Sequence, residues 1–306
     1  MRTYYLLLYG VHGLIFSFIC YLAQILSFII NFQTAEAILT KLTYFSFFIS
    51  IALVMIDLLS LFFSPSAKTL KFSPVKNLNI SVGMTAYNDE LSIKKAAEDF
   101  INQENVCKVV VVDNNSTDKT AEEARKAGAT VIKEEIQGYG ACCIKALREA
   151  MKYGDIICLV EGDCTFSGSD LKKFTAYLEN ADMVVGTRTT KELNTPDSQM
   201  NFLLQWGNVL MAKLVQLKFW SVRLTDMGCT YRIIRRDALE KIIDKLEVKG
   251  NHFLCEMILV ALKNNLMVIE IPITLKKRVG QSKGVGNNFI KAAITAIDMW
   301  KLIISR

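Results

Sequence analysis

The segment that most restricts the fold of this chain is an apolar run that stops abruptly at two acids. Residues 156–160 read IICLV without a polar residue, and Glu161 and Asp163 follow directly. Such a run is typical of a central strand that a parallel sheet buries on both faces. The two carboxylates would then lie at the carboxyl end of the strand, where open α/β sheets bind ligands. They repel each other unless a cation joins them, although solvated turn residues would give the same pattern.

The first sixty residues are far more apolar than the rest. No charged residue occurs within residues 3–35, and Asp57 alone interrupts residues 42–67. Each interval can hold the ~20 residues that a helix needs to cross a bilayer. We therefore predict two transmembrane helices, at about residues 4–30 and 42–63, with two buried core helices as the alternative. The first span is too long for the apolar core of a cleaved signal peptide.

The basic residues beside these spans predict their orientation, because lysine and arginine are retained in the cytosol. Arg2 precedes the first span, and three lysines follow the second: Lys68, Lys71 and Lys76. We expect the loop at residues 32–40 outside and everything after Lys68 in the cytosol. Asp57 is costly against lipid, so it should lie near an end of its helix, face the partner helix, or mark a route for a polar head group.

Beyond residue 77, apolar strand patterns alternate with helical ones, and most of the strand patterns end in polar residues. The strand patterns are residues 78–84, 108–112, 129–133, 156–160 and 183–185. Helical patterns include residues 91–100, 121–127 and 141–153. This alternation predicts an α/β fold with a doubly wound, mostly parallel sheet. The polar strand ends would share one edge of that sheet.

Charge and cysteine usage exclude two classes of protein. The net charge is +6, without a basic run or an aromatic ladder, so we expect contact with anionic lipid and no nucleic acid. The eight cysteines contain no C-x-x-C pair. That usage favours reduced thiols in the cytosol over a disulfide frame or a zinc site.

Eight segments occur in a characteristic order: AYNDE, VVVVDNNSTDKT, QGYGA, VEGDCTF, VVGTR, LTDMGCTYRIIRRDAL, FLCEMILVALKNNLMVIEIPI and RVGQSK. In this order they resemble the family 2 glycosyltransferases of GT-A fold, above all the branch of dolichol-phosphate mannose synthase and the polyprenyl-phosphate sugar transferases. The resemblance covers residues 78–283. It implies a GT-A domain at residues 78–286. The apolar spans and the patterns of the flanking segments predict a membrane anchor at residues 1–66, a linker at 67–77 and an amphipathic interfacial helix at 287–306.

The resemblance implies a donor site at the ends of the first strands. Asp113 would contact the nucleotide base, and its carboxylate suits either uracil or guanine. The other implied donor-binding residues are Tyr87, Asn88, Glu90, Gly138 and Gly140. The two glycines would let the backbone pass close to the donor, with a plain helix-entry turn as the alternative.

Glu161 and Asp163 resemble the D-x-D metal motif of the family, with glutamate in place of the first aspartate. Thr165 stands where some lipid-phosphate transferases place a glutamine ligand. The implied metal is Mg²⁺ or Mn²⁺, which would neutralise the leaving nucleoside diphosphate. Asp163 is the principal expected ligand.

We expect basic residues to line the part of the site that binds the acceptor. Arg188, Arg278, Ser282 and Lys283 would hold the acceptor phosphate, while solvated surface cations are the alternative. A lipid phosphate has a second pKa of about 6, so it is largely an anionic nucleophile at neutral pH and needs no base. Asp226 would therefore position the loop or the acceptor. The expected catalytic residues are Asp163, Arg188, Asp226 and Arg278.

Two later helical patterns suit the surface of a bilayer. Residues 201–218 repeat apolar side chains at helical spacing, and residues 288–304 surround a polar stripe of Lys291, Thr295 and Asp298 with apolar residues. The second pattern indicates an interfacial helix, with a core-packing helix as the alternative.

These features predict an inverting enzyme that moves a sugar from a UDP- or GDP-linked donor to a polyprenyl or dolichyl phosphate. It would act at the cytosolic face of a plasma membrane in a prokaryote or of the endoplasmic reticulum in a eukaryote, as a monomer or a homo-oligomer. The alternatives are a glycolipid or polysaccharide synthase with a hydroxyl acceptor and a silent nucleotide-sugar-binding scaffold. Against a processive synthase, Gln205-Trp206 lacks the Q-x-x-R-W pattern.

Overall fold

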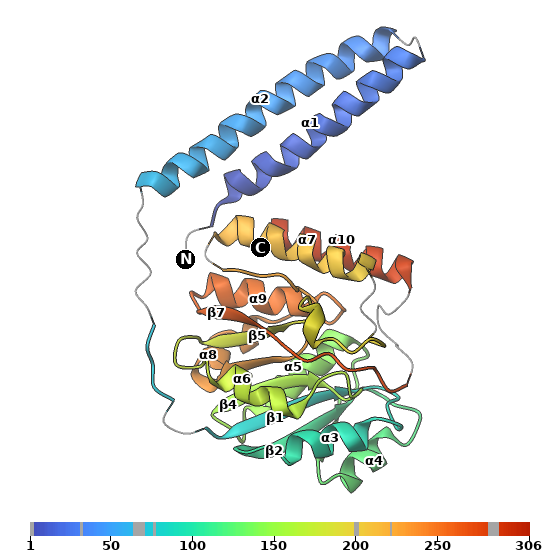
Figure 1. Cartoon of the computed structure of the whole chain (residues 1–306), viewed down its shortest axis with the longest axis vertical. Helices are drawn as coiled ribbons and strands as arrows, with labels where there is room; N and C mark the ends of the chain where they lie inside the picture. Colours follow the sequence, from blue (N-terminus) through green and yellow to red (C-terminus); the bar gives the residue numbers. More distant parts are fainter. Residues whose placement is uncertain are drawn as a thin grey trace. The chain divides into compact units, whose positions relative to one another are not determined.

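The computed structural model describes residues 3–30, 33–63, 71–75, 78–198, 202–220, 222–280 and 288–306. The chain forms two compact units (Figure 1). The larger unit contains Leu70–Val215 and Val222–Arg306, and the smaller contains Arg2–Thr69 and Gln216–Ser221.

The larger unit is built on a seven-stranded sheet in the described part of the chain, with the order β3-β2-β1-β4-β6-β5-β7. Its strands are β1 (Ile80–Ala86), β2 (Val106–Asp113), β3 (Thr130–Lys133), β4 (Ile156–Glu161), β5 (Met183–Thr187), β6 (Arg232–Arg235) and β7 (Val268–Pro272). All neighbours are parallel except β6, which is antiparallel to β4 and β5. The predicted mostly parallel sheet is confirmed. The antiparallel strand brings its amino end to the edge where the parallel strands have their carboxyl ends.

β4 is the central strand that its sequence predicts. It pairs with β1 on one side and β6 on the other, and residues 156–160 are at most 2% exposed. A strand buried on both faces has no solvated side on which a polar residue could alternate. Its first partly exposed residue is Glu161, at the carboxyl end.

Helices cover both faces of the sheet. On one face, α3 (Ile93–Ile101), α4 (Thr120–Lys126) and α6 (Leu171–Thr175) contribute to one apolar core with the strands. On the other face, α5 (Tyr139–Ala150) lies so close to β1 that a Cβ at Gly83 would be 2.6 Å from the carbonyl oxygen of Ala146. α9 (Phe253–Lys263) packs beside α5, and α8 (Arg236–Glu240) follows β6.

Two further helices, α7 (Phe202–Phe219) and α10 (Phe289–Ser305), lie beyond α9 (Figure 1). The side chain of Asn288 caps α10 by accepting a hydrogen bond from the Lys291 N–H at 3.0 Å. Exposed apolar residues of α10 include Phe289, Ile290, Ile294, Ile297 and Trp300. Thr295, assigned to the polar stripe, is instead buried, because this face of α10 turns toward the protein.

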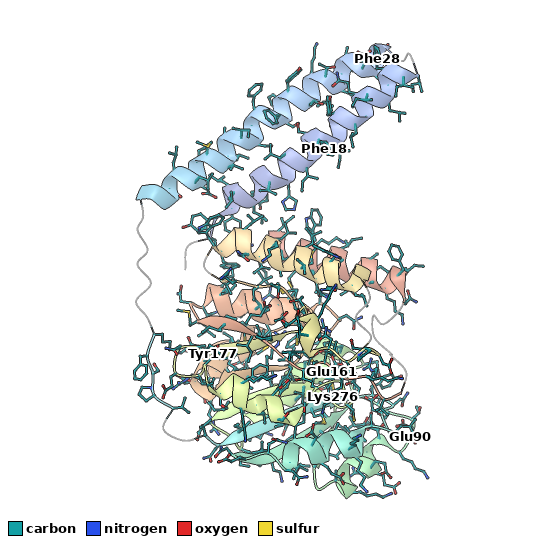
Figure 2. All side chains as sticks on the ribbon, in the orientation of Figure 1. Phe18, Phe28, Glu90, Glu161, Tyr177 and Lys276 are labelled. Carbon is teal, nitrogen blue, oxygen red and sulfur yellow. The ribbon has the colours of Figure 1, made fainter. Side chains whose placement is uncertain are left out.

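The smaller unit contains α1 (Tyr5–Ile29) and α2 (Gln33–Phe63). Both are long and apolar enough to cross a membrane, and the side chains of Phe18 and Phe28, labelled in Figure 2, are 59% and 70% exposed. The prediction of a loop at residues 32–40 is wrong, because α2 begins at Gln33. Residues 33–63 contain no glycine or proline, and charged residues such as Glu36 do not by themselves end a helix.

Small residues allow α1 and α2 to pack closely. A Cβ at Gly13 would lie 2.1 Å from the Ser50 hydroxyl, and Ser17 donates a hydrogen bond to the Thr43 carbonyl at 2.9 Å. Asp57 accepts a hydrogen bond from the Leu7 N–H at 2.7 Å. Asp57 therefore faces the partner helix, one of the three expected positions, and satisfies a free N–H in the first turn of α1.

Candidate active site

The polar residues at the strand ends surround a cavity of about 730 Å³. The carboxyl ends of β1, β4 and β5 contribute Tyr87, Glu161 and Arg188, and the turn before β6 contributes Gly228. Asp163 and Arg278 also line this cavity. The structure thus brings together six residues that the sequence predicted as functional: Tyr87, Glu161, Asp163, Thr165, Arg188 and Arg278.

Asp163 and Arg278 form the closest charged pair of the site. An Arg278 Nη2 atom contacts Asp163 Oδ2 and lies 3.7 Å from Glu161 Oε2. Asp163 is 1% exposed, so its charge would be costly without this cation. One guanidinium therefore bridges the two acids of the E-x-D motif.

Glu161 is held by two hydroxyl groups. Its Oε1 accepts hydrogen bonds from the Tyr139 phenol at 3.0 Å and from the Thr230 hydroxyl at 2.5 Å. Burial and the Asp163 charge raise the pKa of Glu161 to about 7, and Arg278 opposes that shift. Burial also raises the pKa of Tyr139, so its phenol remains a neutral donor.

Thr165 contacts Asp163 rather than standing apart as a further ligand. Its N–H and its hydroxyl donate to Asp163 Oδ1 at 2.9 and 2.5 Å. A threonine hydroxyl that already donates to the carboxylate fixes the direction of that carboxylate. Thr165 thus orients Asp163, and its role as a metal ligand stays a prediction.

The two acids nevertheless suit a divalent ion. They offer carboxylate oxygens at one edge of the cavity, and the structure already places a cation between them. Among the residues that the structure describes, no group of three or more histidine, cysteine or acidic side chains could hold a metal. A metal bound to Glu161 and Asp163 would therefore need further oxygen ligands, which a diphosphate would supply.

Arg188 and Asp226 form a second charged pair, in which Asp226 is fully buried and Arg188 is partly exposed to the cavity. Arg188 Nε and Nη2 donate to the two carboxylate oxygens of Asp226 at 2.7 and 2.8 Å, and the Arg188 N–H adds a third bond at 3.0 Å. Burial would raise the pKa of Asp226, but the Arg188 charge and the hydrogen bonds from Arg188 and the Gly228 N–H together outweigh burial and lower that pKa. Glu270 supports the turn by accepting from the Asp226 N–H at 3.0 Å. Asp226 therefore positions Arg188.

On the donor side, the cavity is lined by Tyr87 and by two residues without a predicted role, Asp89 and Asn114. The Asn114 amide accepts from the Gly138 N–H at 2.9 Å and donates to the Ile136 carbonyl at 2.8 Å, which fixes the loop before α5. Asp113 is buried beside it and accepts from the Ser116 N–H at 3.1 Å. Asp113 does not line the cavity, so its contact with the base stays a prediction.

Asn88 and Glu90 make hydrogen bonds within the loops, and their contact with the donor stays a prediction. Asn88 Oδ1 accepts from the Thr117 N–H at 2.8 Å, and Glu90 Oε2 accepts from the Lys119 N–H at 3.1 Å. These bonds join the loop after β1 to the loop after β2. Neither residue lines the cavity, and Figure 2 shows Glu90 at the rim of the larger unit, away from Glu161.

The structure gives a steric reason for glycine at positions 138 and 140 that does not involve the donor. A Cβ at Gly138 would lie 2.5 Å from the Lys249 carbonyl oxygen, and one at Gly140 would lie 2.2 Å from that of Val248. Gly138 moreover has a φ of 152°, which favours glycine. The segment before α9 therefore passes too close to both glycines for either to carry a side chain. Neither glycine lines the cavity.

The remaining predicted acceptor residues, Ser282 and Lys283, lie outside the described residues. The site also contains two residues that the sequence-based reasoning missed, Tyr139 and Thr230. Both lie within the segments QGYGA and LTDMGCTYRIIRRDAL, but neither segment by itself indicates that their hydroxyls meet at Glu161.

The other wall of the cavity is apolar. It comes from α7 and α10, whose contributions include Leu204, Trp206, Leu210, Met211, Phe289, Ala292, Ala293, Ala296 and Met299. One cavity therefore joins a charged floor at the sheet edge to an apolar wall between two helices.

This fold and site define a GT-A glycosyltransferase. Glucosyl-3-phosphoglycerate synthase from Mycobacterium tuberculosis has a similar fold, with a TM-score of 0.57 at 16% identity over 74% of this chain and 80% of that protein. Residues 81–243, more than half of the chain, match the model of glycosyl transferase family 2. The chain belongs to this family and is a family 2 glycosyltransferase.

Curated relatives include enzymes that are named for lipid phosphates. The chain is 27% identical over 206 residues to the undecaprenyl-phosphate mannosyltransferase of Micrococcus luteus, covering 63% of this chain and 82% of that enzyme. It is 29% identical over 227 residues to a dolichyl-phosphate hexose transferase of Haloferax volcanii, covering 71% and 94%. The low-salt glycan biosynthesis hexosyltransferase Agl6 of Haloferax volcanii is 32% identical over 212 residues. That match covers 66% of this chain but only about half (49%) of Agl6.

Proposed function

We propose that this protein transfers a sugar, with inversion, from a nucleotide-sugar to a polyprenyl phosphate at the cytosolic face of a membrane. The observation that carries the proposal is the single cavity with acids and arginines on its floor and apolar helices on its wall. The floor suits a diphosphate and a phosphate, and the wall suits the first units of a lipid chain. The names of the two lipid-phosphate relatives support this assignment.

For the donor, Glu161 and Asp163 would hold Mg²⁺ or Mn²⁺. When bound, the metal would neutralise the charge that develops on the leaving diphosphate. The similar synthase of Mycobacterium tuberculosis has been crystallised with Mn²⁺ and UDP, which supports a divalent ion and a nucleotide donor. Thr165, Tyr139 and Thr230 keep the two carboxylates in place.

For the acceptor, the charges of the site favour a phosphate over a hydroxyl. A hydroxyl needs a base to take its proton, but both oxygens of Asp226 are occupied by Arg188. A phosphate needs cations, and Arg188 and Arg278 both line the cavity. These two arginines would hold the acceptor phosphate in line with the donor sugar.

For the membrane, α1 and α2 would anchor the chain as a transmembrane hairpin, within an anchor at residues 1–66. Residues 67–77 would then be the linker, residues 78–286 the GT-A domain and residues 287–306 an interfacial helix. The exposed apolar residues of α10 support the last assignment.

The test is a panel of UDP- and GDP-linked sugars with the purified full-length protein in detergent. Acceptors are farnesyl phosphate, a longer polyprenyl phosphate and the matching polyprenols. We expect lipid-linked product with the phosphates and none with the alcohols. Transfer only to a polyprenol, a free sugar or a glycolipid hydroxyl would instead establish a synthase, and donor binding without any transfer would indicate a scaffold.

A further inference from the structure

Arg278 occupies the place between Glu161 and Asp163 that the metal would need. Its guanidinium contacts Asp163 Oδ2 and approaches Glu161 Oε2 to 3.7 Å. Glu161 Oε1 and Asp163 Oδ1 already accept hydrogen bonds from neighbouring hydroxyls, so a divalent ion held by both acids would compete with the guanidinium for Oε2 and Oδ2. Arginine keeps its charge at any accessible pH and cannot yield the site by losing a proton. Its side chain has to move.

The local backbone allows that movement. The Lys276 N–H donates to the Thr165 carbonyl at 2.8 Å and the Val279 N–H donates to the Asp163 carbonyl at 3.0 Å. Residues 276–279 therefore run beside the E-x-D motif and keep the backbone of Arg278 in place. Only the side-chain torsions of Arg278 need to change for the guanidinium to leave.

The guanidinium is also incompletely satisfied where it lies. Its Nε is buried and has no hydrogen-bond partner in the described part of the chain. Arg188, by comparison, is held by Asp226 through both Nε and Nη2. Arg278 thus contacts the acids through Nη2 alone. Arg188 binds its acid through two nitrogen atoms, which is the bidentate geometry of the stronger arginine–carboxylate pairs.

We propose that Arg278 is an internal cation that neutralises Glu161 and Asp163 before a divalent metal binds, and that it leaves them when the metal enters with the donor. The released guanidinium then faces the acceptor phosphate in the same cavity, a step that rests on the proposed function. Donor and metal would accordingly bind before the acceptor.

The experiment measures Mn²⁺ binding to the purified full-length protein from the loss of the free Mn²⁺ EPR signal. It is done without sugar or lipid, alone and with UDP or GDP, so that no turnover occurs. We expect Arg278→Gln to bind Mn²⁺ about tenfold more tightly than the wild type, because the guanidinium no longer competes with Mn²⁺ for the two carboxylates. Mn²⁺ should also raise the melting temperature of Arg278→Gln by more than that of the wild type.

Two variants complete the design. Lys276→Gln removes a neighbouring cation on the same segment that pairs with Asp99 at 3.7 Å, and it should bind Mn²⁺ within about twofold of the wild type. Arg278→Lys keeps a competing charge and should stay closer to the wild type than Arg278→Gln does.

Equal or weaker Mn²⁺ binding by Arg278→Gln would overturn the exchange, and so would a lack of Mn²⁺ binding by every protein in every condition. Neither result involves the acceptor. Transfer to a hydroxyl acceptor in the panel above would refute the lipid-phosphate function and leave the Mn²⁺ competition standing.

Discussion

At the scale of single residues, the site depends on charges that are buried in pairs. Arg188 with Asp226 and Arg278 with Asp163 each place a cation against an acid that is 1% exposed. Removing one member of a buried pair leaves the other uncompensated, which is far more costly than losing a surface pair. Substituting one member of either pair should therefore have a large, measurable effect.

Asp226→Asn should destabilise the protein by about 3 kcal/mol at neutral pH, because it leaves the Arg188 charge unpaired. The pKa of Asp226 is lowered in the folded protein, so its stabilising effect is present above the unfolded value near 4 and is lost as the pH falls through the folded value. Thermal unfolding in detergent should show the difference from wild type shrinking below about pH 4. Asp237→Asn, which removes the exposed partner of Arg235, is the control and should change stability by about 1 kcal/mol or less.

Asp163→Asn should abolish transfer, since it removes one of the two anionic ligands proposed for the metal. A chelator should abolish the activity of the wild type, and added Mg²⁺ or Mn²⁺ should restore it. Asp155→Asn, at an exposed carboxylate just before β4, should retain activity in the same assay. Full turnover in the presence of chelator would refute the metal assignment.

Tyr139→Phe should lower kcat roughly tenfold or more, because hydrogen bonds to charged groups contribute about 1.5 to 3 kcal/mol and this phenol donates to Glu161. The KM for the lipid acceptor should change little. Tyr153→Phe, an exposed tyrosine just beyond α5, provides the control. A Tyr139→Phe enzyme with normal kcat would show that the hydroxyl does not hold Glu161 in the working state.

At the scale of elements, α7 and α10 determine what can enter the cavity from its apolar side. Ala296 lines the cavity, whereas its neighbour Ile297 is 49% exposed and does not. Successive residues of a helix point about 100° apart, so this pair separates the cavity wall from the outer surface of one helix.

Ala296→Trp should raise the KM for a long polyprenyl phosphate about tenfold or more, because the indole fills space that the lipid would use. The KM for the nucleotide-sugar should stay close to that of the wild type. Ile297→Trp adds the same ring on the outer surface and should leave both constants near normal. The proposed lipid site would be wrong if the two variants had the same kinetics.

At the scale of the whole molecule, the topology remains a prediction from the distribution of basic residues. Membrane-impermeant maleimide should label Cys107, an exposed cysteine of the larger unit, only from the cytosolic side of sealed vesicles. Thr34→Cys, at the start of α2, should be labelled only from the opposite side. Labelling of both cysteines from one side would contradict the transmembrane hairpin.

Local patterns in the sequence determined much of this fold. The central strand and the α/β alternation follow from the apolar runs and from the polar residues that end them. Most of the residues predicted for the metal and acceptor sites are also in the cavity, because the carboxyl ends of parallel strands meet at one edge. The start of α2 at Gln33 could not be located, because the charged residues there do not interrupt a helix.

The contacts among those side chains were decided only by the tertiary structure. The antiparallel β6 brings Asp226 to Arg188, and a segment far along the chain brings Arg278 between Glu161 and Asp163. The tertiary structure also explains Gly138, because a side chain there would collide with the carbonyl oxygen of Lys249. A sequence shows which residues carry charge or lack a side chain, but which groups meet depends on strand order and helix packing, and these are properties of the folded chain.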